Sequence, residues 1–581
     1  MQKINRKDFR AFTGYLKPYY KLAILAPLFM VLEVIMDLMQ PKLLSRIVDH
    51  GIMMGNMDLI IKTGFMMIIV AVIGMIGGIG CTIFSTIASQ NFGHDLRKDM
   101  FKRILDFSPA DIDRFTPSSL ITRLTNDINQ VQQLVLMSLR LLVRGPLLCI
   151  GGIVMAFIIN FELSLIILVL IPLLLFIFFK ITKKSFHLFS IVQQKIDRLN
   201  LVVRENLSGI RLIRIFNRQE YEKQRFYEAN RNLATSLLQA INVVIKIGPI
   251  VMLIINAGIL SILWFGGKMY LAQRIEIGEI MAFISYLLII MMSLVMVSNF
   301  FIFISRAGAS IERINEIFKI KQRREDIHYK EIEIKGNVEF KNVFFDYEKD
   351  KNEPLLKNIC FSVEQGETVG IIGKTGSGKT TLLNLIVGLY TPLKGEVLID
   401  NVPVKEISPE ILRKNTGYVS QNVFLFSGTI REIIAWGKPD ASDEEIKQAA
   451  KIAMMYDFIL SLPDGFDTYI GEKGINLSGG QRQRLTIAAA IIKKPKILIF
   501  DDCTSSVDLL TEKNIFSNLK KIEKCTTFIV TPRIFSIMDA DKIIVIEDGT
   551  IAGIGTHQEL LETCRYYREV VESQTGEKIN A

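Results

Sequence analysis

The chain has 581 residues, which is too long for one compact domain, and half of them are hydrophobic. The hydrophobic excess lies in the first half of the chain and ends near Ser305. Six cysteines and five histidines are scattered without paired spacing, which excludes a disulfide framework and argues against a zinc or histidine metal centre. The formal charge of +10 fits the cytoplasmic loops of a membrane protein better than nucleic acid binding, so no nucleic acid partner is expected.

Six apolar segments are predicted to cross a lipid bilayer. The third and fourth are separated only by Glu162 and are predicted to form a helical hairpin with a tight outer turn near Asn160. The polar opening of the chain and the length of the first apolar segment argue against a cleaved signal peptide. The predicted spans are residues 22–39, 63–93, 145–161, 163–179, 247–267 and 280–305.

Lysine and arginine predict how these spans are oriented. They crowd the N-terminus and two long loops, residues 97–123 and 180–231, whereas the connections near Asn160 and at residues 266–278 carry few. By the positive-inside rule, the N-terminus, both loops and the C-terminal half are predicted to be cytoplasmic at a cell membrane. Both loops have helical patterning, so the membrane helices are predicted to extend well beyond the bilayer.

Glu33 and Asp37 lie four residues apart and share one face of the first predicted span. An ionisable group inside a span normally faces a bundle interior or a watery cavity. The pair therefore predicts a polar substrate surface that prefers cations. The alternative is a pair that is solvated near the outer interface or bonded to a neighbouring helix. Arg140 and Arg144 repeat the spacing in the third span and are expected to reach cytoplasmic headgroups.

The soluble half contains a phosphate-binding loop at residues 373–380, "GKTGSGKT", in its required strand-to-helix context. Glycines let backbone N–H groups converge on phosphate oxygens, Lys379 adds positive charge, and the Thr380 hydroxyl can bind magnesium. A second apolar strand, "KILIFD", ends at Asp501, which is suited to holding magnesium through water. Together these features predict an α/β domain that binds a nucleotide at the carboxyl ends of its strands. The nucleotide-binding residues predicted in the loop are Gly373, Gly376, Ser377, Gly378, Lys379, Thr380 and Thr381.

The segment "LSGGQ" at residues 477–481 lies between the phosphate loop and the Asp501 strand. In this order and spacing it resembles the signature of ATP-binding cassette (ABC) transporters. Six spans followed by one cassette resemble an ABC exporter half-transporter, and the fused layout implies export. The resemblance implies a six-span α-helical transmembrane domain followed by an α/β P-loop cassette, with ATP and Mg²⁺ as cofactors. The predicted boundaries are 1–318 for the membrane domain, 319–336 for a charged linker, 337–575 for the cassette and 576–581 for a tail.

The same resemblance implies roles for further residues. Tyr347 is similar to the aromatic residue that stacks on adenine, with an ordinary core tyrosine as the alternative. Gln421 is similar to the glutamine that reaches magnesium and links nucleotide state to the membrane domain. Glu472 and the segment 505–508, which ends at Asp508, are similar to contacts between the two ATP sites. Residues 108–115 and 216–223 lie where the family forms coupling helices, unless they are plain solvated loop helices.

One phosphate loop and one signature per chain imply a dimer. In this family ATP lies between the phosphate loop of one subunit and the signature of the other, so the signature residues are expected to contact the partner's nucleotide. These residues are Ser478, Gly479, Gly480 and Gln481.

Two positions depart from the family pattern. The family has a glutamate after the magnesium aspartate and a histidine after the next strand, and this chain has Asp502 and Pro532 there. Asp502 is one methylene shorter than glutamate, and proline has neither an imidazole nor a backbone donor. The site built on this chain is therefore expected to bind ATP and hydrolyse it poorly.

The leading hypothesis is one subunit of a heterodimeric exporter whose partner carries the catalytic glutamate and histidine. Its substrates would be amphiphilic drugs or lipids, since Met- and Phe-rich helices favour an adaptable apolar cavity. One alternative is a slow homodimer that runs on two aspartates. Another is an ATP-gated channel or regulatory module that binds ATP without hydrolysing it.

Overall fold

The computed structural model describes residues 12–320, 329–347, 353–520 and 524–576. The chain divides into two compact units. The first comprises Met1–Leu105 and Pro117–Ile320, and the second comprises Asp106–Thr116 and Lys321–Ala581. A short segment of the first long loop therefore belongs to the second unit. The polar N-terminus and parts of the predicted linker and tail lie outside the described residues.

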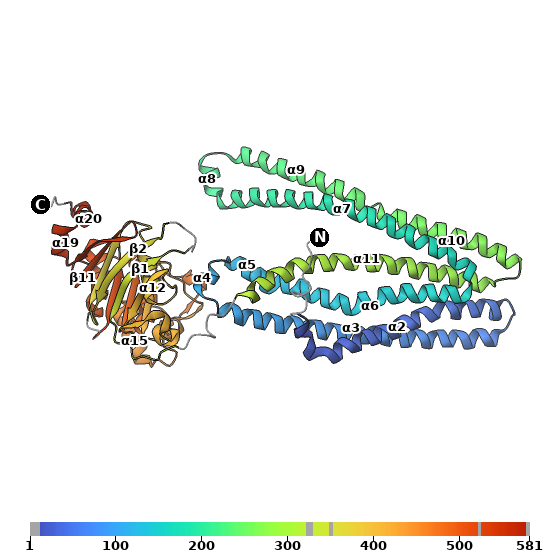
Figure 1. Ribbon diagram of the computed structural model, residues 1–581, viewed down its shortest axis with the longest axis horizontal. Helices are drawn as coiled ribbons and strands as arrows, with labels where there is room; N and C mark the ends of the chain where they lie inside the picture. Colours follow the sequence, from blue (N-terminus) through green and yellow to red (C-terminus); the bar gives the residue numbers. More distant parts are fainter. Residues whose placement is uncertain (1–11, 321–328, 348–352, 521–523, 577–581) are drawn as a thin grey trace. The chain divides into compact units, whose positions relative to one another are not determined.

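The first unit consists of helices (Figure 1). Six helical runs in the described residues are long and apolar enough to cross a membrane, which confirms the predicted number of spans. The longest single helix has 49 residues, or about 74 Å at 1.5 Å per residue, against about 30 Å of hydrocarbon. The prediction that the helices outrun the bilayer is therefore confirmed. The long helices are α2 (Tyr20–Arg46), α3 (Met57–Leu105), α6 (Ile128–Ile159), α7 (Phe161–Ser208), α9 (Gln219–Val244), α10 (Ile247–Leu271) and α11 (Ile277–Lys319).

Short elements join these helices. Asn160 separates α6 from α7 in an extended conformation and caps α7 by accepting the Leu163 N–H at 3.0 Å, as the predicted tight turn requires. The segment 108–115 contains a short helix, as predicted. The segment 216–223 contains no separate short helix: α8 ends at Ile215, residues 216–218 form a turn, and residues 219–223 are the start of α9. The short elements are η2 (Ile47–Ile52), α4 (Pro109–Ile112), α5 (Pro117–Thr122), η3 (Arg123–Asp127) and α8 (Ile210–Ile215).

Glycines bring α2 and α3 into close contact. A Cβ atom at Gly77 would lie 2.9 Å from the backbone N of Glu33 and from the backbone O of Phe29. At Gly80 it would lie 2.5 Å from the Phe29 ring. Only glycine allows this approach, and small residues are what membrane helices use to gain packing area where lipid supplies no hydrophobic driving force.

Arg144 on α6 bridges two carboxylates of α2. Its Nη1 lies 2.8 Å from Glu33 Oε1, and its Nη2 donates to Asp37 Oδ2 at 3.0 Å. The expectation that Arg144 reaches headgroups is therefore wrong, because two carboxylates inside the bundle offer a nearer partner for its charge. Glu33 and Asp37 are bonded to a neighbouring helix, the alternative considered for them above.

The second unit contains two main sheets. The first is antiparallel, in the order β2-β1-β4-β5, and the second has the order β12-β11-β3-β10-β9-β6, with β12 its only antiparallel strand among the described residues. All five residues of β9 and of β10 are buried, because helices cover both faces of a parallel sheet. The strands are β1 (Val338–Phe345), β2 (Leu356–Val363), β3 (Thr368–Gly373), β4 (Lys394–Ile399), β5 (Val402–Pro403), β6 (Thr416–Val419), β7 (Gly428–Thr429), β8 (Tyr469–Ile470), β9 (Ile497–Asp501), β10 (Thr526–Val530), β11 (Lys542–Glu547) and β12 (Thr550–Gly555).

Helices of the second unit follow the strands, as an α/β domain requires. They are α12 (Lys379–Ile386), α13 (Pro409–Lys414), α14 (Ile430–Ala435), α15 (Asp443–Ile452), α16 (Tyr456–Leu460), α17 (Gly479–Ile491), α18 (Leu509–Leu519), α19 (His557–Thr563) and α20 (Arg565–Thr575). The fold of the described residues is a six-span helical domain followed by an α/β domain, as predicted.

The contact of Arg144 with α2 can be tested by thermal unfolding in detergent. Replacing Arg144→Leu leaves Glu33 and Asp37 without their partner, so we expect a destabilisation on the order of 2 kcal/mol. Adding Glu33→Gln and Asp37→Asn to this variant removes the stranded charges and should restore most of the melting temperature. A wild-type melting temperature for Arg144→Leu alone would contradict the bridge.

Candidate functional site

Three parallel strands end at one edge of the larger sheet and bring the predicted site residues together. β10 lies between β3 and β9, and Val530 is paired with both Ile371 and Asp501. The phosphate loop follows β3. Asp501 is the last residue of β9 and Asp502 comes directly after it, while Pro532 comes shortly after β10. Residues separated by more than a hundred positions in the sequence thus meet because their strands are neighbours.

The phosphate loop begins at Gly373 and leads directly into α12. Gly376 and Gly378 have φ angles of 84° and 100°, a region that side chains disfavour, and a Cβ at Gly378 would lie 2.4 Å from Leu356. The Lys379 ammonium donates to the carbonyls of Gly373 and Lys374 at 2.8 and 2.7 Å, so it lies across the loop. Burial lowers the pKa of Lys379. A cation held over converging N–H groups fits a polyphosphate.

Asp501 is buried, with 2% of its surface exposed, at the end of β9. Its Oδ1 accepts the Thr380 hydroxyl at 3.0 Å and its Oδ2 accepts the Tyr418 hydroxyl at 3.2 Å. Burial raises the pKa of Asp501, which marks a carboxylate in need of a positive charge. A hydroxyl beside a buried carboxylate is the oxygen donor set that Mg²⁺ prefers, so Thr380 and Asp501 fit that ion.

Tyr418 was not anticipated as a site residue. It lies on β6, which pairs with β9, and only this pairing brings its hydroxyl to the Asp501 carboxylate. In the sequence, its place three residues before Gln421 was the only available signal.

Asp502 is engaged by Gln421. The Gln421 amide donates to Asp502 Oδ2 at 3.0 Å, while Oδ1 is buried with no hydrogen-bond partner among the described residues. The backbone of Asp502 has a φ of 45°, and its N–H donates to the Val530 carbonyl at 2.8 Å. Burial raises the pKa of Asp502. The position of Asp502 is therefore fixed by two hydrogen bonds, one from its backbone to Val530 and one from Gln421 to its side chain.

Pro532 occupies the position at which the family pattern has a histidine. The neighbouring Arg533 donates to Glu512 Oε2 at 2.9 Å and to the carbonyls of Ser505 and Val507 at 3.0 Å each. Glu512 is buried, with 2% of its surface exposed. The segment after β10 is thereby tied to residues 505–508.

Tyr347 has a half-exposed ring, with 49% of its surface accessible, and its hydroxyl lies 3.0 Å from the Thr381 hydroxyl. The ring packs edge-on against Tyr390 at 5.1 Å between centroids. Tyr390 in turn donates to Asp113, directly after α4, at 2.6 Å. An exposed aromatic face anchored beside the phosphate loop fits a nucleobase. Tyr347 is therefore linked, through Tyr390 and Asp113, to the segment that contains α4.

The predicted signature residues start helix α17. Ser478 is the N-cap: its hydroxyl accepts the Gln481 N–H at 3.3 Å, and the Gln481 side chain accepts the Ser478 N–H at 2.8 Å. A Cβ at Gly480 would lie 2.8 Å from the carbonyl of Ser506, whose N–H donates to Gln483 at 3.0 Å. The signature is thus packed on the segment 505–508, at the positive end of a 13-residue helix.

Glu472 and Asp508 lie outside the phosphate-loop cluster. Glu472 is exposed at the start of the short helix η6 (Glu472–Gly474). Asp508 caps α18 by accepting the Thr511 N–H at 2.9 Å, and this hydrogen bond lowers the pKa of Asp508. The carboxylate of Asp508 therefore already has a structural role within the chain.

A phosphate-binding domain fused to six membrane helices defines an energised membrane transporter, of the class in which membrane and ATPase domains share one chain. Comparisons with known proteins specify the class further. Residues 23–294 match the family model for the ABC transporter transmembrane region, and residues 356–505 match the model for ABC transporters. The chain belongs to the ABC transporter family.

Individual relatives cover nearly the whole chain. It is 40% identical over 563 residues to the ABC transporter ATP-binding protein YfiB of Bacillus subtilis (strain 168), covering 97% of this chain and 98% of that protein. It is 34% identical over 568 residues to Rv1273c of Mycobacterium tuberculosis (strain ATCC 25618 / H37Rv), covering 97% of each. A solved bacterial Atm1-family ABC exporter with ATP bound shares the fold, with a TM-score of 0.80, 24% identity, and coverage of 97% and 99%.

These findings make the chain an ABC half-transporter, with a membrane domain fused to an ATPase domain, and a multi-pass protein of the cell membrane. Its ATPase domain binds ATP, and members of the family hydrolyse ATP and function as dimers in the membrane.

The buried carboxylate of Asp501 predicts a pH dependence of nucleotide binding. Because burial raises its pKa, Asp501 takes up a proton at a higher pH than an ordinary aspartate does, and only the ionised form attracts Mg²⁺. Mg²⁺-ATP affinity should therefore fall on acidification, by about tenfold per pH unit below that pKa. Calorimetric titration over an acidic pH series measures this.

Asp501→Asn serves as the control for the pH series, because protonation of ATP itself affects both proteins equally. We expect weaker binding by this variant at neutral pH and a shallower acid limb. An acid limb of the same depth in both proteins would assign the dependence to another group.

Proposed function

We propose that this chain is one subunit of a heterodimeric ABC exporter, that its own site binds Mg²⁺-ATP with little hydrolysis, and that its signature completes the partner's competent site. The observation that carries the proposal is the engagement of Asp502 by Gln421 beside a proline in place of the switch histidine. The roles of the remaining nucleotide-binding residues follow the family pattern given above.

The position of Asp502 argues against general-base catalysis. Its side chain is shorter than glutamate by about 1.5 Å, one carbon–carbon bond, and a base must come within hydrogen-bond reach of its water. One carboxylate oxygen accepts from Gln421, and the other is buried. Loss of general-base assistance typically slows a reaction roughly 10²–10⁴-fold. Pro532 adds a second deficit, because no imidazole follows β10 to contact the γ-phosphate.

The signature has none of these defects. Ser478 and Gln481 form a complete capping box, and Gly480 is packed directly on Ser506. An intact signature serves the nucleotide held by the other subunit in this family. This asymmetry favours a partner that carries the glutamate and histidine over a second copy of the same chain.

Helices α7 and α9 form a hairpin (Figure 1), and exposed apolar side chains near its α8 end also support a dimer. At and just after α8, Leu212, Ile215 and Phe216 are 60%, 75% and 69% exposed. These residues follow the charged, predicted cytoplasmic part of α7, so lipid tails do not explain their exposure. An apolar helix end of this kind is expected to dock on the partner subunit.

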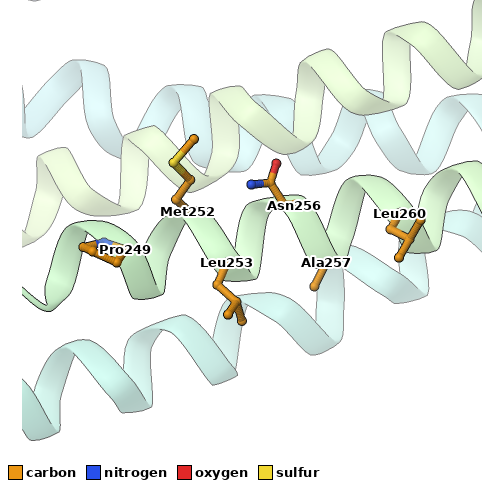
Figure 2. Close-up of a pocket in the computed structure, with 6 residues that line it drawn as sticks. All are labelled: Pro249, Met252, Leu253, Asn256, Ala257 and Leu260. Carbon is orange, nitrogen blue, oxygen red and sulfur yellow. The ribbon is translucent and has the colours of Figure 1, made fainter.

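A shallow hollow along α10 gives the same indication within the predicted membrane (Figure 2). Asn256 is its one amide side chain, and it is exposed with no hydrogen-bond partner among the described residues. An unsatisfied amide is costly in hydrocarbon, so this face is expected to line a watery cavity or meet the partner. The lining residues are Pro249, Met252, Leu253, Asn256, Ala257 and Leu260.

In the proposed mechanism, ATP closes the dimer of cytoplasmic cassettes, and coupling helices such as α4 transmit this closure. The cavity then turns outward and releases an amphiphilic drug or lipid. Hydrolysis at the partner's site resets the transporter.

The composition of the native complex tests the proposal. We expect the tagged chain, extracted gently from its own membrane, to copurify with an equal amount of a second half-transporter that has glutamate and histidine at the catalytic positions. In this complex, Asp502→Asn should change the ATPase rate by less than about twofold. Replacing the partner's catalytic glutamate with glutamine should lower the ATPase rate roughly 10²–10⁴-fold.

The alternatives give different results in the same preparation. A homodimer would yield only this chain, and its ATPase activity would collapse in Asp502→Asn. An ATP-gated channel would produce ATP-dependent ion currents in planar bilayers without a competent partner. Either result would overturn the proposed heterodimeric exporter.

The substrate preference is tested separately with Glu33→Gln combined with Asp37→Asn. Because Arg144 already pairs with both carboxylates, a cationic substrate must compete with it or use the unpaired carboxylate oxygens. We expect transport of cationic dyes to fall severalfold more than transport of neutral dyes in inverted vesicles. Equal losses for both kinds of dye would remove the charge preference and leave the triad a structural role.

A further inference from the structure

The C-terminal helix α20 contacts the ATP site through the side-chain amide of Gln574. Its Nε2 donates to the Pro532 carbonyl at 2.7 Å, and its Oε1 accepts the Ile534 N–H at 3.0 Å. One amide therefore satisfies a backbone acceptor and a backbone donor on either side of Arg533, as a neighbouring β-strand would. The segment that follows β10 is held in place by a residue from the end of the domain.

Helix α20 is a firm support for this contact. Tyr567 and Val571 lie on its buried face with 0% and 3% of their surfaces exposed. The Tyr567 hydroxyl lies 2.7 Å from His557 Nδ1 on α19. Gln574 is on the exposed side of the same helix, so its backbone is fixed by the core while its side chain reaches the segment after β10.

The same helix also contacts the phosphate loop. The Lys374 ammonium lies 5.5 Å from the centroid of the Tyr566 ring, a cation–π distance, and 2.9 Å from Glu547 Oε1. Lys374 is the second residue of the loop that starts at Gly373. One helix therefore contacts both the phosphate loop and the segment that follows β10.

Arg533 extends the influence of Gln574 to the signature. It lies between the two residues that Gln574 binds, and it donates to the carbonyls of Ser505 and Val507. Ser506, between them, packs against Gly480 and donates to Gln483 of α17. A movement of the segment after β10 would therefore displace residues 505–508, which are expected at the dimer interface.

We propose that Gln574 is a positioning residue that keeps the segment after β10 in place and so slows the release of ATP from this chain's site. Because the proposed site hydrolyses little ATP, the residence time of ATP depends on the stability of the loops around it. The inference rests on the proposed function in this respect. Two hydrogen bonds of ordinary strength correspond to about a tenfold change in a rate or equilibrium constant.

The test measures ATP release from each chain of the native complex. The complex is loaded with radiolabelled azido-ATP and Mg²⁺ and chased with excess ATP. It is irradiated after different delays, and the chains are separated by electrophoresis, so that each band reports its own site. We expect Gln574→Met, which keeps the length of the side chain but removes both hydrogen bonds, to release label from this chain about tenfold faster.

Glu569→Gln is the matched control, because it removes an exposed ion pair with Arg565, 2.8 Å apart, on the same helix. It should behave like the wild type, and the partner's band should decay at the same rate in all three proteins. The loss of two hydrogen bonds should lower the melting temperature of the complex by no more than about 2 °C, and a larger fall would assign the faster release to unfolding. A wild-type release rate for Gln574→Met would overturn the proposal, and so would equal acceleration of both bands.

Failure of the proposed function has its own signature in this experiment. A single labelled chain in the complex, or conversion of the label on this chain to ADP, would contradict the heterodimer with a non-hydrolysing site. The effect of Gln574→Met on the release rate would be judged independently of that result.

Discussion

The ATP site depends on three buried parallel strands that end side by side. β3, β10 and β9 are neighbours in one sheet, so the phosphate loop, Pro532 and the two aspartates meet at one edge although they are far apart in the sequence. β9 and β10 are buried on both faces, so a slip of β9 by one residue would disrupt the packing along the strand and move Asp501 away from Thr380 and Tyr418. The strand pairing therefore fixes both aspartates, and every later contact of the site is built on that register.

The membrane domain depends on a different constraint, the high cost of an unpaired charge away from water. Inside the bundle, Arg144 forms ion pairs with Glu33 and Asp37. Where the helices continue beyond the predicted spans, ion pairs join the apolar contacts between them. There Arg123 binds Glu316 at 2.7 Å and the Arg313 carbonyl at 2.6 Å, while Arg313 pairs with Asp127. Buried apolar side chains such as Ile314 and Ile317 continue the packing in this region, and the ion pairs leave its buried charges paired.

Features encoded by neighbouring residues could be predicted from the sequence. The phosphate loop, the Asp501 strand, the tight turn near Asn160 and the number of spans all follow from local patterns of glycine, charge and apolar length. Features that need two distant segments could not. Arg144 was assigned to headgroups because its partners lie on another helix. Tyr418 and Gln574 were missed because only strand pairing and the packing of α20 bring them to the site. The short helix α8 was misplaced by a few residues, since nothing local distinguishes it from the start of α9.

Asp502 depends both on a feature encoded by neighbouring residues and on a contact with a distant segment. Its place after β9 is fixed by the sheet, whereas its role depends on the residue that approaches it. Asp502 is one methylene shorter than a glutamate, and its carboxylate lies where the Gln421 amide donates to it at 3.0 Å. Gln421 is expected to report nucleotide state to the membrane domain, so a carboxylate that holds it favours one arrangement of that segment. In this view the substitution does more than remove a base. Under the proposed function, the position that would time ATP turnover stabilises a structural contact instead, and ATP bound at this site would be a long-lived part of the dimer interface.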